Sequence, residues 1–168
     1  EAVERIQLLM NQNKISAEER TVRRPALEKA EKCNGTAVAI RLENGETVTG
    51  RSSKLMSASS SAVLNAIKAL SSIGDDMLLL SPIVLAPIIK LKKEVLCEDK
   101  VKLNLGDVLT ALSICAATNP VAEKAMDMLV ALRGCEAHAS CILPETDMSY
   151  VRELGLNMTC EPEFGTKD

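Results

Sequence analysis

The chain has 168 residues, of which 46% are hydrophobic and 26% charged, a composition that is typical of one globular domain and excludes intrinsic disorder. The net charge is −3, the Lys and Arg residues are scattered, and Tyr150 and Phe164 are the only aromatic residues, so we expect no nucleic-acid partner. Six cysteines without a C-x-x-C pair are typical of a cytoplasmic protein, and the apolar runs are too short to cross a membrane.

The first 34 residues are expected to form a helical lead-in that follows a missing preceding domain. The sequence opens at Glu1 without a Met, and apolar residues at near-helical spacing follow at once. Ser16 and Glu19 have the pattern of a capping box for a second helix, which should end at Asn34-Gly35. Residues 35–168 are expected to form a single α/β domain.

A β-hairpin is predicted next along the chain. Residues 36–42 alternate between apolar and other side chains, and residues 46–51 are rich in Thr and Val, which indicates two strands. Asn44-Gly45 between them is the strongest short signal for a hairpin. It predicts a type I′ turn, in which both central residues have positive φ.

Helices and short strands alternate over the rest of the chain. We expect helices around residues 63–70, 82–97, 105–117, 120–134 and 146–155, and strands at residues 77–80, 137–143 and 156–160. The strand at residues 77–80 is inferred from a continuous apolar run, which is typical of a strand buried on both faces. The order predicts a three-layer α/β/α fold with a mixed sheet of about five strands, including the N-terminal hairpin.

This layout resembles that of the zinc-dependent cytidine deaminases, in which a hairpin is followed by helices that carry the metal ligands. Those enzymes need His or Cys two residues before Glu on the first helix, and P-C-x-x-C on the next. Residues 61–64 read SAVL and residues 81–85 read SPIVL, so neither segment offers a ligand. We therefore expect a similar topology without zinc, any other metal or a cofactor.

The segment that most suggests ligand binding is Thr49-Gly50-Arg51-Ser52-Ser53-Lys54. It leaves a predicted strand and enters a helix N-terminus, where free N–H groups and the helix dipole favour a phosphate or carboxylate. The spacing is not that of a Walker A loop. The alternative is a serine-rich capping loop on which Arg51 and Lys54 are simply solvated.

His138 and Asn119 are two further candidates. His138 is the only histidine and shares a strand face with Glu136, which makes it a candidate general base with an orienting carboxylate. The alternative is a structural histidine with satisfied hydrogen bonds. Asn119 follows one apolar helix, where it could line a pocket, or it could simply cap the helix that begins at Pro120.

Four blocks of the sequence resemble the C-terminal region of a bacterial family known as domain of unknown function eighteen-forty-six. They are, in order, Thr49-Gly50-Arg51 with Ser53 and Leu55, residues 113–120 (SICAATNP), Gly134-Cys135 with Ala137-His138, and residues 156–162 (LNMTCEP). The resemblance covers nearly the whole chain, although none of the blocks is a known catalytic signature. It implies a preceding P-loop-like domain in the same chain, and a phosphorylated or nucleotide-like ligand between the two domains.

Two functional hypotheses follow. The first is the C-terminal domain of a bacterial enzyme that handles a nucleotide or phosphometabolite, with His138 as the catalytic candidate and a ligand-binding set of Thr49, Gly50, Arg51, Ser53 and Asn119. The second is a structural or oligomerisation domain without its own active site, whose Met- and Leu-rich helices form an interface, for example between two copies. The first predicts that the polar candidates converge on one concave edge, and the second predicts an exposed apolar helix face.

Overall fold

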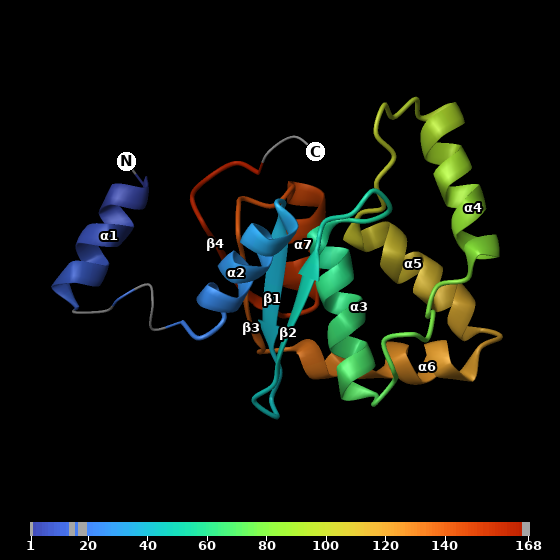
Figure 1. The fold of residues 1–168 in the computed structure, drawn as a ribbon, viewed down its shortest axis with the longest axis horizontal. Coiled ribbons are helices and arrows are strands. Elements are labelled where there is room, and N and C mark those ends of the chain that lie inside the picture. Colours follow the sequence, from blue (N-terminus) through green and yellow to red (C-terminus); the bar gives the residue numbers. More distant parts are fainter. Residues whose placement is uncertain (1, 14–15, 17–19, 166–168) are drawn as a thin grey trace.

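Residues 2–13, 16 and 20–165 are described by a computed structural model, in which they form a mixed α/β fold (Figure 1). The strands are β1 (Ala37–Arg41), β2 (Thr47–Arg51), β3 (Glu136–Ala139) and β4 (Asn157–Cys160). They make one sheet in the order β2-β1-β3-β4, in which β1 pairs antiparallel with β2 and β3, and β3 pairs parallel with β4. The predicted α/β class and the mixed sheet are confirmed.

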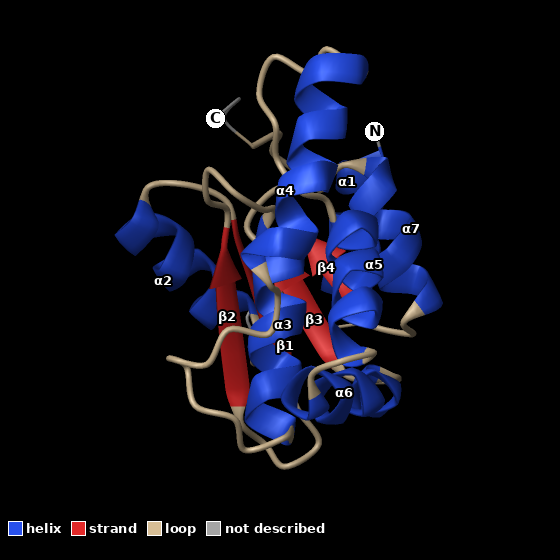
Figure 2. Ribbon diagram, turned by 90° about the vertical axis from the view of Figure 1, so that its right-hand side faces the viewer, coloured by secondary structure: helices blue, strands red, loops and turns tan. Residues whose placement is uncertain are grey.

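Helices cover both faces of the sheet (Figure 2). Neighbouring residues of a strand point to opposite faces. Val38 of β1 joins the main apolar core with α3 (Ala58–Leu70), whereas Ala39 packs with Ala26 of α2 (Arg23–Cys33). The helix α2 therefore covers one face, and α3 covers the other.

The remaining helices lie mostly on the α3 side of the sheet. They are α4 (Pro82–Lys90) with a π-helical turn over residues 91–95, α5 (Leu105–Ala116), α6 (Pro120–Asp127) with a 3-10 turn over residues 128–132, and α7 (Glu145–Glu153). The first helix, α1 (Ala2–Gln12), has no buried residue. The division of the chain into residues 1–34 and 35–168 stays a prediction.

The N-terminus of α5 makes polar contacts with α7 and with the π-helical turn that follows α4. Asn104 and Asp107 form a capping box there, and the Asp147 carboxylate of α7 accepts a hydrogen bond from the Leu105 N–H at 2.8 Å. The Lys92 ammonium group, on the π-helical turn after α4, lies 3.0 Å from the Asp107 carboxylate. These contacts satisfy N–H groups at this helix end, although Asp147 Oδ2 is buried and has no hydrogen-bond partner among the described residues.

Two of the predicted elements differ from the structure. The strand at residues 77–80 is wrong, because this segment contains no strand and the sheet of the described residues has four strands. Leu79 and Leu80 are buried in the apolar core without pairing in the sheet, and a short apolar run cannot distinguish these two kinds of burial. The second helix begins at Arg23 rather than near Ser16, and Glu19 lies outside the described residues.

The predicted hairpin forms, but its turn is not of type I′. Gly45 has a φ of +86°, whereas Asn44 is not among the residues with positive φ. The Gly45 N–H donates to the Leu42 carbonyl at 2.9 Å, and the Leu42 N–H donates to the Glu46 carbonyl at 2.8 Å. This is the pattern of a three-residue loop that ends in one left-handed residue. Only Gly45 therefore needs the conformational freedom of glycine.

Replacing Gly45 by Val should destabilise the protein by about 1 kcal/mol or more, because a β-branched residue resists positive φ. A Cβ at this position would meet nothing within 4 Å, so the cost comes from the backbone alone. Urea denaturation measures the change, with Gly45→Asn as the control, since Asn adopts the left-handed conformation more readily. Equal midpoints for wild type and Gly45→Val would contradict this account of the turn.

Candidate functional site

One glycine fixes the position of the candidate segment against α3. A Cβ on Gly50 of β2 would overlap the backbone of Ala62 in α3, so only glycine permits this approach. Beside it, the Asn65 side-chain amide of α3 donates to the Thr49 carbonyl at 2.8 Å. Because side chains alternate along a strand, Thr49 and Arg51 point to the other face of β2.

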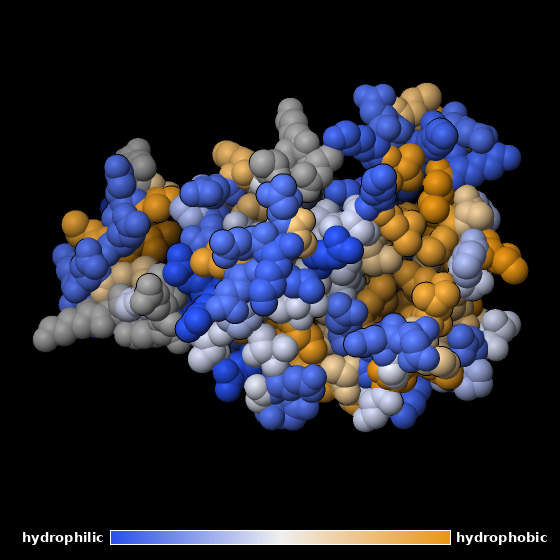
Figure 3. All heavy atoms as spheres, viewed as in Figure 1, coloured by the Kyte–Doolittle hydropathy of each residue, from blue (hydrophilic) through white to orange (hydrophobic). Residues whose placement is uncertain are grey.

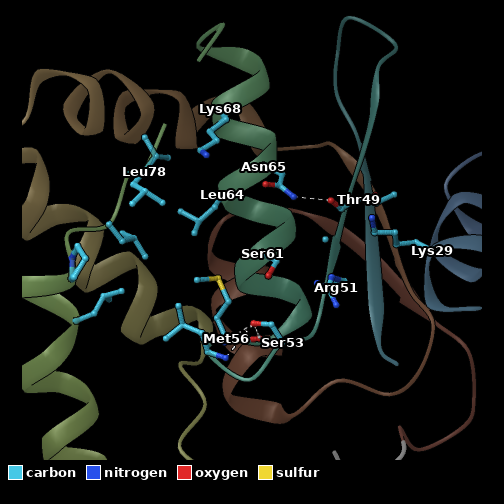
Figure 4. Close-up of a pocket in the computed structure, with 16 residues that line it drawn as sticks. Lys29, Thr49, Arg51, Ser53, Met56, Ser61, Leu64, Asn65, Lys68 and Leu78 are labelled. Atoms are coloured by element: carbon cyan, nitrogen blue, oxygen red, sulfur yellow. Dashed lines mark hydrogen bonds between the residues drawn. The ribbon is translucent and has the colours of Figure 1, made fainter. Parts of the chain in front are cut away.

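A hollow of about 520 Å³ opens beside this edge of the sheet (Figure 4). Four predicted residues, Thr49, Gly50, Arg51 and Ser53, all line it. Much of the remaining lining is apolar and comes from around α3 and α4: Leu55, Met56, Leu64, Leu78, Leu79, Leu80, Pro82 and Leu85. Figure 3 shows apolar side chains gathered between these two helices. The hollow therefore has an apolar wall and a polar end.

A second hollow, of about 590 Å³, shares Arg51 and Ser53 with the first. Neither hollow is lined by an Asp or Glu of the described residues, although the whole chain has a net charge of −3. The cations that line one or both are Lys29, Arg51, Lys54, Lys68, Lys100 and Lys102. Such a gathering of one charge sign in a concave surface creates a positive potential that attracts anions.

The two serine hydroxyl groups of the segment form hydrogen bonds within the protein. Ser53 Oγ accepts hydrogen bonds from the N–H groups of residues 55–56, each at 3.2 Å. Ser57 Oγ caps α3 by accepting from the Ser60 N–H at 3.3 Å, and Ser60 is fully buried. This end of α3 therefore carries a side-chain cap of its own. Arg51 and Lys54 are exposed, whereas Ser52 and Ser53 are half-buried.

Arg51 is the cation best placed to meet a ligand. It is exposed and lies at the junction of the two hollows. Its guanidinium has no ion pair within the part of the chain that the structure describes. In Figure 4, Arg51 and Lys29 lie on one side of α3, while Leu64 and Leu78 lie on the other.

Asn119 does not join this site. It is the N-cap of α6, and its side-chain oxygen accepts a hydrogen bond from the Val121 N–H at 3.0 Å. Neither of the two hollows is lined by Asn119. Its contacts are those of the capping alternative that the sequence left open.

His138 also lies apart from the hollows, in a buried network beneath α2. The residue is 4% exposed, and its ring has Nδ1 2.7 Å from Thr159 Oγ1 and Nε2 3.1 Å from Glu161 Oε1. Arg23 of α2 donates to the same Glu161 carboxylate at 2.6 Å. The network therefore connects α2, β3 and the end of β4. These are the contacts of a structural histidine with satisfied hydrogen bonds.

The carboxylate beside His138 is not the one that we expected. Glu136 shares the strand face but is exposed, and Glu161 makes the contact. The parallel register of β3 and β4 places Thr159 opposite His138, and Glu161 follows two residues later. This pairing is not visible in the sequence, so reasoning from residue spacing missed Glu161. The same holds for Lys29, which α2 brings to the hollow.

Neither a metal cluster nor a membrane-spanning helix is present among the residues that the structure describes. No three His, Cys, Asp or Glu side chains come together there as ligands for an ion. No helix in the same part of the chain combines the length and apolarity needed to cross a bilayer. All six cysteines are free thiols.

The stability of the protein should fall as the pH is lowered from about 7.5 to about 5.5, because of His138. Burial lowers the pKa of His138 below its ordinary value of 6.5, although Glu161 acts in the opposite direction. The unfolded chain therefore binds the proton first as the pH falls. The stabilisation is fully present above pH 6.5 and is lost below it, towards the pKa of the folded protein.

Urea denaturation of the wild type and of His138→Gln across this pH range tests the prediction. His138 is the only histidine of the chain, so the variant should be less stable but should show a flatter dependence on pH. The range stays above the pKa of Glu161, which its hydrogen bond from Arg23 holds below the ordinary value of 4.5. The same slope in both proteins would contradict the assignment to His138.

Comparison with known proteins agrees with the resemblance that the four sequence blocks indicate. The family model described as domain of unknown function DUF1846, C-terminal, matches residues 18–168. A UPF0371 protein of Clostridioides difficile (strain 630) is 42% identical over 175 residues, which cover 99% of this chain and 35% of that protein. A UPF0371 protein of Clostridium botulinum (strain Eklund 17B / Type B) is 41% identical over 172 residues, which cover 98% of this chain and 34% of that protein.

The chain therefore spans about a third of the length of these relatives. The family model covers nearly all of it, including both hollows and the His138 network. The chain belongs to the DUF1846 family and corresponds to its C-terminal domain.

Proposed function

We propose that this chain is the C-terminal domain of a larger bacterial protein that handles a nucleotide or phosphometabolite, and that it binds the phosphorylated ligand at Arg51. One observation carries the proposal: Arg51 lines both the apolar hollow and the second, cationic hollow. A phosphorylated metabolite has two matching parts, an anionic group and a less polar body. The planar guanidinium fork suits the oxygens of a phosphate.

The cationic hollow would hold the phosphate. Lys54, Lys100 and Lys102 line this hollow together with Arg51, and the Lys102 ammonium donates to Ser52 Oγ at 2.7 Å. This bond ties the loop before α5 to the loop after β2. The cations thus come from two segments that are held together, which limits the reorganisation needed when an anion binds.

The apolar hollow would hold the body of the ligand. Its volume of about 520 Å³ falls within the range of about 300 to 1,000 Å³ that is usual for small-molecule sites. Met56, Leu64 and Leu85 supply an apolar wall, while Ser61 and Asn65 supply polar groups. A mostly apolar wall with a few polar groups at one end is the common arrangement of such sites.

We extend the proposal to the rest of the protein. The relatives are about three times as long as this chain, and the family resemblance implies a preceding P-loop-like domain, which we propose as the partner in the same chain. A ligand between the two domains would then meet phosphate-binding groups from both sides. Free thiols at all six cysteines support our placement of the protein in the cytoplasm.

A second role, in a structural or oligomeric interface, is favoured by a different observation. Several large apolar side chains near α4 are exposed, among them Ile83 at 84% and Leu78 at 74%. Monomeric proteins rarely leave contiguous apolar surface open to water without a function for it. The two roles are compatible, because a ligand site and an interface can share one helix.

Phosphorylated probes should raise the melting temperature of the chain, and replacing Arg51 by Ala should remove most of that rise. A probe at about 100 times its dissociation constant adds about 2.7 kcal/mol of apparent stability, or about 5 to 10 °C for a domain of this size. The probes are pyrophosphate, AMP and a sugar phosphate, with adenosine as the uncharged comparison.

Arg41→Ala is the matched control for this thermal-shift experiment. Arg41 is an exposed arginine at the end of β1 that lines neither hollow, so its loss should leave the shift intact. A shift that is equal in wild type and Arg51→Ala would place the anion elsewhere. If no probe shifts the wild type, the isolated chain has no formed anion site at Arg51.

A further inference from the structure

One helix face on the outside of the molecule is apolar and exposed. Ile83, Pro87, Leu91 and Val95 follow one another at intervals of four residues along α4 and its π-helical turn, and we call this set the α4 ridge. Ile83, Leu91 and Val95 are 84%, 50% and 68% exposed, respectively. Residues four apart lie on the same face of a helix. The ridge is therefore a continuous apolar stripe.

The opposite side of the same helix is packed against the rest of the protein. Leu85 is buried in the core, and Lys92 is only 8% exposed. The Lys92 ammonium group lies 3.0 Å from the Asp107 carboxylate and 3.1 Å from the Glu98 carboxylate. These contacts fasten α4 and its π-helical turn to the start of α5. The ridge is thus presented on a supported element, so little ordering is needed before a partner binds.

The helix α4 carries both surfaces: Leu85 on its buried side lines the apolar hollow, whereas the α4 ridge lies on its exposed side. Leu78, Pro82 and Leu85 line that hollow, and Ile83 of the ridge follows Pro82 directly.

We infer that the α4 ridge is the docking surface for the preceding region of the same protein. The inference rests on the proposal that this chain is the C-terminal domain of a longer protein. The chain covers 35% of its Clostridioides difficile relative, and the matching family model is the C-terminal one. About two thirds of that relative's length is therefore available as the occupant.

Interface size favours this occupant over a second copy of the chain. A stable contact between separate molecules buries about 800 Å² on each partner and involves about 20 to 30 residues a side. The ridge offers four residues of one helix. A region tethered in the same chain meets the ridge at an effective concentration of roughly millimolar order, so a much smaller apolar contact suffices.

Hydroxyl-radical footprinting of the longer protein and of the 168-residue chain tests the inference. Oxidation of Ile83 should fall roughly tenfold in the longer protein, because the exposure of this residue would drop from 84% to near that of the buried Leu85, 8%. Val130 is 81% exposed on the turn after α6, and its peptide is the internal reference, with no change expected.

Ile83→Glu and Val130→Glu are matched variants of nearly equal exposure. In the longer protein, Ile83→Glu should restore the oxidation of Leu91 and Val95, since an unpaired carboxylate cannot be buried in an apolar contact. Val130→Glu should leave the oxidation of Leu91 and Val95 unchanged. Neither change should alter the melting temperature of the 168-residue chain, where both positions face water.

Equal oxidation of the ridge in both proteins would overturn the inference. So would protection that is already present in the 168-residue chain and grows with its concentration, because a second copy would then be the occupant. The thermal shift with pyrophosphate is measured on the 168-residue chain alone. Failure of the docking inference is therefore distinguishable from failure of the proposed anion site.

Discussion

Gly50 lies where α3 crosses β2 so closely that any Cβ would overlap the backbone of Ala62. Because side chains alternate along the strand, this contact directs Thr49 and Arg51 to the opposite face, where Lys29 of α2 lines the same hollow. On the other side, α3 contributes Leu64 to the apolar wall. One close backbone contact thus sets the position of the apolar wall relative to the cations. A side chain at residue 50 would push α3 away from β2 and would change the position of the apolar wall relative to the cations.

Much of the fold could be predicted because its signals are local. The hairpin and the helix that begins at Pro120 follow from short patterns, and the structure contains both. The type I′ turn was wrong because Asn44-Gly45 fits either of two loops, each with glycine at a positive φ. The strand at residues 77–80 was wrong because an apolar run of that length is equally suited to burial among helices. Which loop forms, and whether an apolar run joins the sheet, depend on contacts between segments that are distant in the sequence.

The candidate site, like the fold, could be predicted only where its residues are neighbours in the sequence. Thr49, Gly50, Arg51 and Ser53 are adjacent in the chain, so one pattern could find them, and they line one hollow. The other cations could not be found, because Lys29, Lys68, Lys100 and Lys102 come from separate segments. Cations that are scattered in the sequence gather only on folding. The apolar periodicity of α4 likewise predicts a helix, but it does not reveal which stripe stays exposed.

The most direct test of the central claim is a titration of the isotope-labelled chain with pyrophosphate, followed by nuclear magnetic resonance of the backbone amides. If Arg51 and its neighbouring cations bind the anion, the amides of residues 49–54 and 100–102 should shift together and saturably. Those of Asn119 and His138, which lie outside both hollows, should stay in place. Shifts centred on Asn119 or His138, or none at residues 49–54, would contradict the assignment.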